Sequence, residues 1–270
     1  MFFSKVRYTL SILCACILVL QLFTYAFCFS KEEIDDCLLR GNNHLLRGEV
    51  DQAISEFTQA IKIVREIKPD ASYAQAYYSR AVAYEYKGDL ENAVSDYTEA
   101  IKLDPRNFLS YYRRGDIYQK TGRLFEAMSD YSSIIEIDQN QAHAYNNRGI
   151  VYGLMGDSDK ALKEYDKALK ISPKIINVHF NRGVAYLNKK DYFQAMNEFA
   201  KELEISPSSF NAKHYHLATS YFFNNKYDKS WDEVHILQGG GYKVSSIFIE
   251  ELKKASGGEK ESGSNFNKEL

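Results

Sequence analysis

AHAYNNRGIVYGLMGDSDKALKEYDKALKISPKI, residues 142–175, decides the fold, because the chain repeats this pattern every 34 residues. The glycine at position 156 has counterparts at Gly122 and Gly88, and Lys190 takes the same slot one period later. Small residues, aromatic residues and prolines recur at the same interval. Self-similarity at a fixed period near 34 residues is typical of a helical repeat array.

Within this stretch the spacing predicts two helices. The first carries small and aromatic residues at i, i+4 and i+7, namely Tyr145, Gly149 and Tyr152. The second repeats that spacing at Ala161, Tyr165 and Ala168. Gly156 breaks the first helix, Asp157 or Ser158 caps the second, and Pro173 ends it. Such a hairpin cannot bury its apolar face alone, but stacked neighbours can.

These residues resemble the tetratricopeptide repeat (TPR) family, whose pattern has an aromatic residue, Gly and Tyr on the first helix and Ala, Phe or Tyr, Ala and Pro on and after the second. The resemblance implies an all-α fold, a right-handed α-solenoid of about six helical hairpins with a C-terminal capping helix. Where the family often has Leu before the Gly, this chain has Arg80, Arg114, Arg148 and Arg182. We expect their stems to pack and their charged heads to reach solvent or an acidic neighbour.

The array is expected to cover residues 31–238. Its repeats are expected at 34–67, 74–107, 108–141, 142–175, 176–209 and 211–238, followed by a capping helix at 239–256 and a flexible tail at 257–270. Six extra residues at 68–73 are expected to lengthen the preceding helix and to break it at Pro69. The closing segment resembles that of exported bacterial TPR proteins.

Residues 1–30 differ from the rest of the chain. Lys5 and Arg7 precede an apolar run at 10–29 that contains no acidic residue, which indicates an export signal. The run is also long enough to span a bilayer, so a cleaved signal peptide and a membrane anchor at residues 8–29 both stay open. Lipidation at Cys28 is a minor alternative. We expect a periplasmic or secreted protein, or one anchored to the membrane and facing outside the cytoplasm.

Composition favours a folded domain, with 45% hydrophobic and 26% charged residues. The net charge of −2 gives no reason to expect nucleic acid or an anionic membrane surface as a partner. His214 and His216 stand at i, i+2 and point apart on a helix, so we expect no metal site there. Only Cys37 lies in the repeat region, and catalytic motifs are missing from it, so we expect no enzyme and no cofactor.

Binding is therefore the expected function, in the concave groove that this family lines with its first helices. The candidate peptide-binding residues lie on a stripe rotated about a third of a turn from the packing stripe, with Asn147 and Asn181 beside it. They are Tyr78, Tyr86, Tyr112, Asp116, Lys120, His143, Asn146, Asn147, Asn177, Phe180 and Asn181. The same stripe includes Ile150, Leu154, Val184, Leu187 and Asn188. Aromatic rings beside amides suit a peptide, because amides pair its backbone and rings cover its side chains. The alternative is that these residues only pack between neighbouring first helices.

We expect a non-catalytic scaffold that binds a protein or peptide, and that serves as an assembly or adaptor factor outside the cytoplasm. One alternative is a membrane-anchored accessory subunit of an envelope enzyme or secretion complex. Another is a carrier of a small ligand or glycan, which needs a closed pocket between repeats. The lysine and asparagine set with which chaperone-binding members hold a C-terminal carboxylate is missing from every run of three repeats. The sequence leaves the partner and the oligomeric state open.

Overall fold

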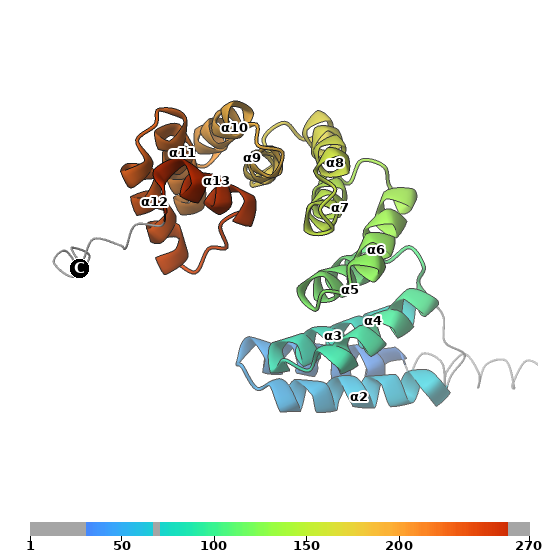
Figure 1. Ribbon diagram of the computed structural model, residues 1–270. Coiled ribbons are helices and arrows are strands. Elements are labelled where there is room, and N and C mark those ends of the chain that lie inside the picture. Colours follow the sequence, from blue (N-terminus) through green and yellow to red (C-terminus); the bar gives the residue numbers. More distant parts are fainter. Residues whose placement is uncertain (1–30, 67–70, 259–270) are drawn as a thin grey trace, which may run out of the picture. The chain divides into compact units, whose positions relative to one another are not determined.

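The computed structural model describes residues 31–66 and 71–258. The expected signal or anchor at 1–30, the break at Pro69 and the tail beyond residue 258 lie outside the described residues. The described part contains helices and turns without a strand, so the all-α expectation is confirmed there. The chain divides into two compact units, the first of which ends at Ile117 and the second of which begins at Tyr118. Their boundary falls inside one helix (Figure 1).

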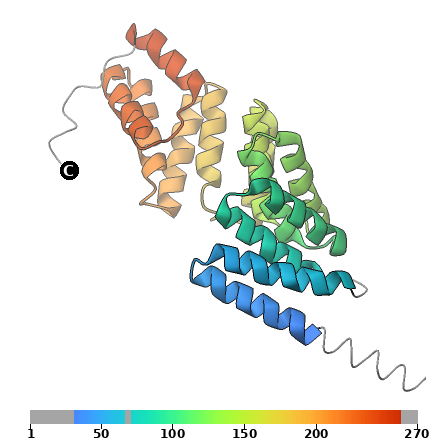
Figure 2. The ribbon, with the colours of Figure 1, turned by 90° about the horizontal axis from the view of Figure 1, so that it is seen from below.

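The N-terminal unit contains the first hairpins. Its elements are a helix at 31–46, α2 (Val50–Glu66), a 3-10 turn η1 (Ala71–Tyr73), α3 (Ala74–Lys87), α4 (Leu90–Leu103) and the start of α5 (Phe108–Lys120). The helices α2, α3 and α4 lie side by side, as Figures 1 and 2 show. With 17 residues, α2 is longer than the 14-residue α4, as the extra residues after it led us to expect.

The C-terminal unit continues the pattern. Its elements are α6 (Leu124–Ile137), α7 (Ala142–Leu154), α8 (Ser158–Ile171), α9 (Val178–Asn188), α10 (Tyr192–Ile205), α11 (Phe210–Phe223), α12 (Tyr227–Gly239) and α13 (Ser246–Ser256). Three hairpins form from α7 with α8, α9 with α10, and α11 with α12, and each packs on the next (Figure 1).

The turn inside each hairpin needs a left-handed residue. Gly88 and Gly156 fill it with φ of 80° and 84°, a region where glycine carries no steric penalty. Lys190 and Asn225 stand in the same slot with φ of 62° and 59°. The second helix of a repeat then starts at a cap, as where Asp157 accepts the backbone N–H of Lys160 at 3.0 Å.

Inside the hairpins, a glycine on the first helix meets a buried ring on the second. A Cβ atom added to Gly149 would lie 2.6 Å from Cε1 of Tyr165, and one added to Gly183 would lie 2.5 Å from Cε1 of Phe199. In the hairpin of α3 and α4, Ala81 takes this slot in one cluster with Tyr97. The small residue thus sets how closely the two helices approach.

Three of the four arginines before this slot, Arg80, Arg148 and Arg182, form ion pairs, which confirms for them that the charged head reaches an acidic neighbour. Arg80 donates to both carboxylate oxygens of Asp96 at 2.7 and 2.8 Å, and its third nitrogen donates to Thr58 at 3.1 Å. Arg148 likewise contacts Glu164 at 2.7 Å and Ser132 at 3.0 Å. Each arginine thus joins the second helix of its own hairpin to the second helix of the hairpin before it. Arg182 pairs with Asp166 and Glu198 in the same way, and Arg114 donates to Thr98 on the second helix of the hairpin before it.

The closing helix α13 covers the end of the last hairpin. Phe248 and Leu252 are buried in one cluster with Trp231, whose indole N–H donates to Ser256 at 3.0 Å. Lys190 and Glu251 form an ion pair at 2.9 Å. The expected capping segment began at 239, but α12 extends to Gly239 and residues 240–245 form a non-helical connection.

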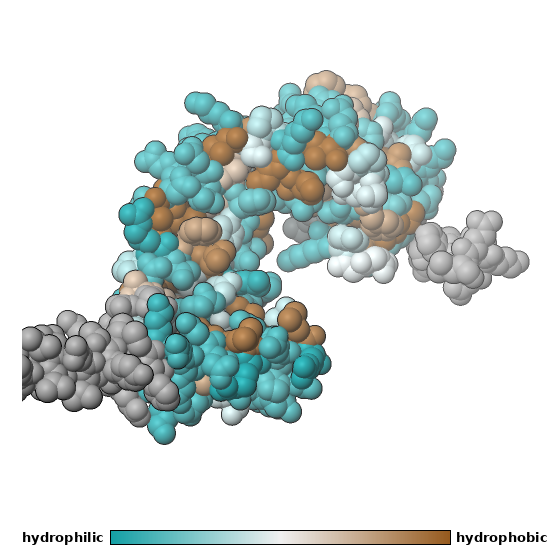
Figure 3. All heavy atoms as spheres, turned by 180° about the vertical axis from the view of Figure 1, so that it is seen from behind, coloured by the Kyte–Doolittle hydropathy of each residue, from teal (hydrophilic) through white to brown (hydrophobic). Residues whose placement is uncertain are grey.

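Exposed large apolar side chains occur along the described chain, from Leu39 to Tyr242. Figure 3 shows small brown groups among hydrophilic teal side chains. Exposed rings include Phe125 and Phe193. Across residues 31–66 and 71–258, every helix is too short or too polar to cross a bilayer.

Candidate functional site

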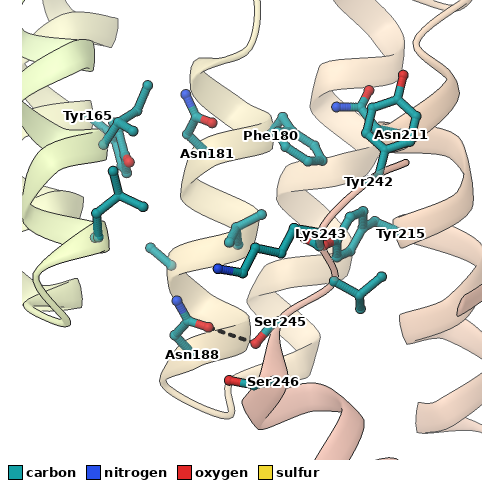
Figure 4. Close-up of a pocket in the computed structure, with 16 residues that line it drawn as sticks. Tyr165, Phe180, Asn181, Asn188, Asn211, Tyr215, Tyr242, Lys243, Ser245 and Ser246 are labelled. Atoms are coloured by element: carbon teal, nitrogen blue, oxygen red, sulfur yellow. Dashed lines mark hydrogen bonds between the residues drawn. The ribbon is translucent and has the colours of Figure 1, made fainter. Parts of the chain in front are cut away.

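A pocket of about 510 Å³ lies in the C-terminal unit, among α7, α9, α11 and the connection at 240–245 (Figure 4). Its wall is largely apolar and includes Ile150, Leu154, Phe180, Val184, Tyr215, Tyr242 and Val244. Its polar groups are Asn181, Asn188, Asn211, Lys243, Ser245 and Ser246. First helices of three successive hairpins thus contribute to one site.

Aromatic packing holds the wall between α9 and α11. The ring of Phe180 lies 5.6 Å from that of Phe199 and 5.5 Å from that of Tyr215, in tilted and edge-on contacts. Tyr215 is buried, and its hydroxyl donates to the carbonyl of Lys243 at 3.0 Å. Burial raises the pKa of Tyr215 to about 12, so this hydroxyl keeps its proton at neutral pH. The bond ties the connection to α11.

Two more contacts fix the connection. The rings of Tyr242 and Phe210 stack with centroids 5.6 Å apart. Ser245 donates to the side-chain oxygen of Asn188 at 2.8 Å and accepts the N–H of Phe248, which caps α13 (Figure 4). The connection is therefore anchored to α9 and α11 at both its ends.

The asparagine side chains around the pocket differ in their hydrogen-bond partners. Asn181 donates to Asn146 at 3.0 Å, and Asn146 donates to Asn147 at 3.1 Å. Asn146 is buried, so it supports Asn181 from behind and does not line the pocket. Asn211 accepts a hydrogen bond from Ser209 at 2.7 Å through its side-chain oxygen.

Of the expected groove residues, Phe180 and Asn181 line this pocket, together with four further residues of the expected stripe, Ile150, Leu154, Val184 and Asn188. Leu187 of that stripe is fully buried in the core, which corrects its expected place in the groove. It stands directly before the α9 C-terminus, where the closing helix covers it. Lys120 and His143 are exposed and lie outside the lining, and Asn147 is half-buried.

Asn177 stands at the start of α9 and not in the pocket. It is exposed with a left-handed φ of 68°, and α9 begins at Val178, two residues after the expected repeat boundary. The carboxylate of Glu202, which is fully buried, accepts the backbone N–H groups of Asn177 at 2.9 Å and Phe180 at 3.3 Å. Glu202 thereby supplies the helix cap that no local side chain provides.

The remaining candidates lie in the N-terminal unit. Tyr78 is half-buried, and its ring packs 5.7 Å from that of Tyr97. Burial and the carboxylate of Asp116 raise the pKa of Tyr112, whose side chain is half-buried. Tyr86 is 74% exposed. Tyr78 therefore packs against the second helix of its own hairpin.

Sequence reasoning missed the α11 and connection side of the pocket. Tyr215 follows Phe180 by 35 residues, which is one repeat plus the extra residue of the sixth repeat, so a signal for it existed. Residues 240–245 have no counterpart in the repeat, so periodicity could not place them. Within the part of the chain that the structure describes, no three His, Cys, Asp or Glu side chains gather closely enough to hold a metal ion.

Family models of the tetratricopeptide repeat match residues 38–97 and 142–175, and a TPR repeat model matches 85–122 and 115–156. A tetratricopeptide repeat protein from Parabacteroides merdae has a similar structure, with a TM-score of 0.67, 15% identity and coverage of 83% of this chain and 87% of that one. PilF of Pseudomonas aeruginosa gives 0.62 at 18% identity, over 83% and 99%. YrrB, described as a TPR protein with an unusual peptide-binding site, gives 0.55 at 22% identity, over 66% and 89%. At these identities the likeness shows the fold.

Proposed function

The chain belongs to the tetratricopeptide repeat family, and from that premise we propose that it is a non-catalytic scaffold that binds a peptide segment of a protein partner. The proposed site is the pocket among α7, α9 and α11. Family membership supports a protein-interaction scaffold in general. YrrB, a structural neighbour described by its peptide-binding site, adds support for a peptide as the bound form.

The observation that carries the proposal is the composition of the pocket wall. Apolar residues and rings stand beside the amides of Asn181, Asn188 and Asn211 in a volume of about 510 Å³. A peptide in an extended form presents backbone N–H and C=O groups that amides can pair, and side chains that apolar walls can cover. Ligand sites combine a mostly apolar wall with a few placed polar groups in this way.

Selection of a phage-displayed library of random decapeptides on the full chain tests the proposal. The affinity of an enriched peptide is then measured by calorimetry for the wild type and for Leu154→Ser combined with Tyr242→Ser. Both side chains line the pocket and are partly exposed, but Tyr242 also stacks on Phe210, so Leu154→Ser is measured alone as well, because it leaves the contacts of the connection intact. We expect the pair to weaken binding roughly tenfold or more, as truncated interface anchors do.

Phe193→Ser is the matched control. Phe193 lies in the same unit, is 52% exposed against 56% for Leu154, and is outside the pocket lining. Full affinity in the folded pocket variant, or loss of affinity in the Phe193 variant, would place peptide binding elsewhere on the chain.

A carrier of a small ligand or glycan is the second candidate, because about 510 Å³ falls within the roughly 300–1,000 Å³ of small-molecule sites. A library selection that enriches no peptide, together with a small molecule retained through purification and lost from the pocket variant, would favour this candidate.

We also propose that the protein acts outside the cytoplasm, as an assembly or adaptor factor. Lys5 and Arg7 before an uncharged apolar run support export. Cell fractionation with N-terminal sequencing tests it: a mature start near Phe29 or Lys31 supports a soluble exported form. An intact N-terminus in the membrane fraction supports the anchored accessory subunit, and an intact chain in the cytoplasm would refute export.

A further inference from the structure

We propose that the peptide bound by this pocket carries an acidic side chain, Asp or Glu, at an internal position between apolar residues. This inference rests on the proposed function and specifies the class of peptide that the same site selects. It follows from the amide N–H groups that have no partner in the pocket, from the positive charge of Lys243 in the lining, and from the position of Lys243.

The amides of the pocket present donors more than acceptors. The side-chain oxygen of Asn188 is engaged by Ser245, and that of Asn211 by Ser209. The N–H groups of both amides have no partner among the described residues. An amide oxygen that already accepts one hydrogen bond has one lone pair left, whereas both N–H groups of such an amide remain available. Both side chains are therefore set to donate to a ligand oxygen.

Lys243 is the one charged residue in the lining, which contains no aspartate or glutamate. Within residues 31–66 and 71–258 it makes no ion pair. The carbonyl of Lys243 is held by the buried hydroxyl of Tyr215, so its backbone position is fixed. A cation carried on a fixed backbone among hydrogen-bond donors is complementary to a carboxylate and unfavourable to a basic side chain.

The place of Lys243 indicates an internal residue of the peptide. In Figure 4, Asn211 and Tyr242 lie on one side of the Lys243 side chain, and Asn188 and Ser246 lie on the other. A peptide that reaches the cation midway along the pocket continues past it in both directions. Its neighbouring side chains then meet the apolar wall formed by residues such as Phe180 and Leu154.

A double-mutant cycle tests the contact. The peptide enriched by the library selection is compared with the same peptide carrying Gln for Glu or Asn for Asp, each on the wild type and on Lys243→Met. We expect either single change to weaken binding roughly three- to tenfold, the range of a partly exposed ion pair, and the second change to add little.

Lys213→Met is the control for net charge. Lys213 is exposed on α11, the helix that also carries Asn211 and Tyr215, but it lies outside the lining. We expect this variant to bind the peptide as the wild type does. If both lysine changes weaken binding equally, the effect comes from the net charge of the protein, and a specific contact with Lys243 is refuted.

The outcomes separate this inference from the function on which it rests. Enriched peptides without an acid that still lose affinity in the Leu154 and Tyr242 variant would overturn the acidic preference and keep peptide binding. Loss of affinity on amidation of the peptide C-terminus, with no effect of the internal Gln, would overturn the internal position. Absence of any peptide that binds the pocket would overturn both.

Discussion

Replacing Gly149 by alanine should destabilise the protein, whereas the same change at Gly153, four residues along α7, should not. An alanine Cβ at 149 would stand 2.6 Å from Cε1 and 2.9 Å from Cδ1 of Tyr165. At 153 the nearest atom is the Tyr165 hydroxyl at 4.0 Å. Both glycines lie on one helix and face the same ring, so the pair isolates close contact from helix propensity.

The expected size follows from two opposed effects. Alanine in place of glycine stabilises a helix interior by about 1 kcal/mol, and this applies at both positions. An added methyl in a filled core costs about 1–3 kcal/mol. Ala81, packed with Tyr97 in the hairpin of α3 and α4, shows that such a hairpin can form around a Cβ in this slot. The difference of the two effects leaves Gly149→Ala destabilised by up to about 2 kcal/mol, while Gly153→Ala should stabilise by about 0.5–1 kcal/mol.

Urea unfolding followed by circular dichroism measures both variants against the wild type. The loss at 149 should shrink when Tyr165→Leu is present, since the clash involves that ring. Gly149→Leu should cost several kcal/mol or prevent folding. Equal or greater stability of Gly149→Ala compared with Gly153→Ala would refute the close helix approach on which the hairpin geometry depends.

Three further predictions concern ion pairs and the closing helix. Arg148→Met should cost about 2–3 kcal/mol in urea unfolding, because it leaves the buried carboxylate of Glu164 with only a lysine, and a loss below about 0.5 kcal/mol would contradict this. Burial alone would raise the pKa of Glu198, but hydrogen bonds from His179 and Lys201 outweigh burial and lower it. The stability that ionised Glu198 contributes is therefore fully present above the ordinary carboxyl pKa and is lost as pH falls through the lowered pKa. Glu198→Gln should then flatten the decline of the melting temperature below about pH 4.5. An unchanged decline would contradict the assignment. Ser245→Ala should raise amide hydrogen exchange across residues 246–256 by removing a cap that typically contributes about 1 kcal/mol, and unchanged exchange there would show that packing alone holds the helix.

The periodic part of this fold could be predicted from the sequence. The 34-residue interval predicted the hairpins, and the glycine slot predicted the turn even where Lys190 fills it with a left-handed φ of 62°. The arginine contacts could be stated only as acidic neighbours in general. Their partners stand at a fixed separation on the other helix, as Glu164 does for Arg148, but this pattern becomes meaningful only when the helix pairing is known.

The site was harder to predict, because one side of it is built by the repeating first helices and the other by a connection that has no counterpart in the repeat. Phe180 lies on the expected stripe and Asn181 beside it, and both line the pocket. Lys243 belongs to a connection without a repeat counterpart, and its position depends on a bond from Tyr215 that no spacing rule predicts. Leu187 was expected in the groove but lies in the core, because the closing helix covers that part of α9.

The arginine contacts determine which changes in chain length leave the stacking of the hairpins intact. Arg114 and Arg148 each reach a hydroxyl 16 residues earlier, while Arg80 reaches Thr58 across 22 residues, because the six-residue insertion lies between them. The bond survives the insertion, so it depends on helix stacking and not on loop length. A whole repeat could therefore be duplicated or excised with every remaining arginine still meeting a partner on both sides. A gain or loss of residues within a helix would instead rotate the arginine away from both partners. The array can thus gain or lose whole repeats and keep these contacts.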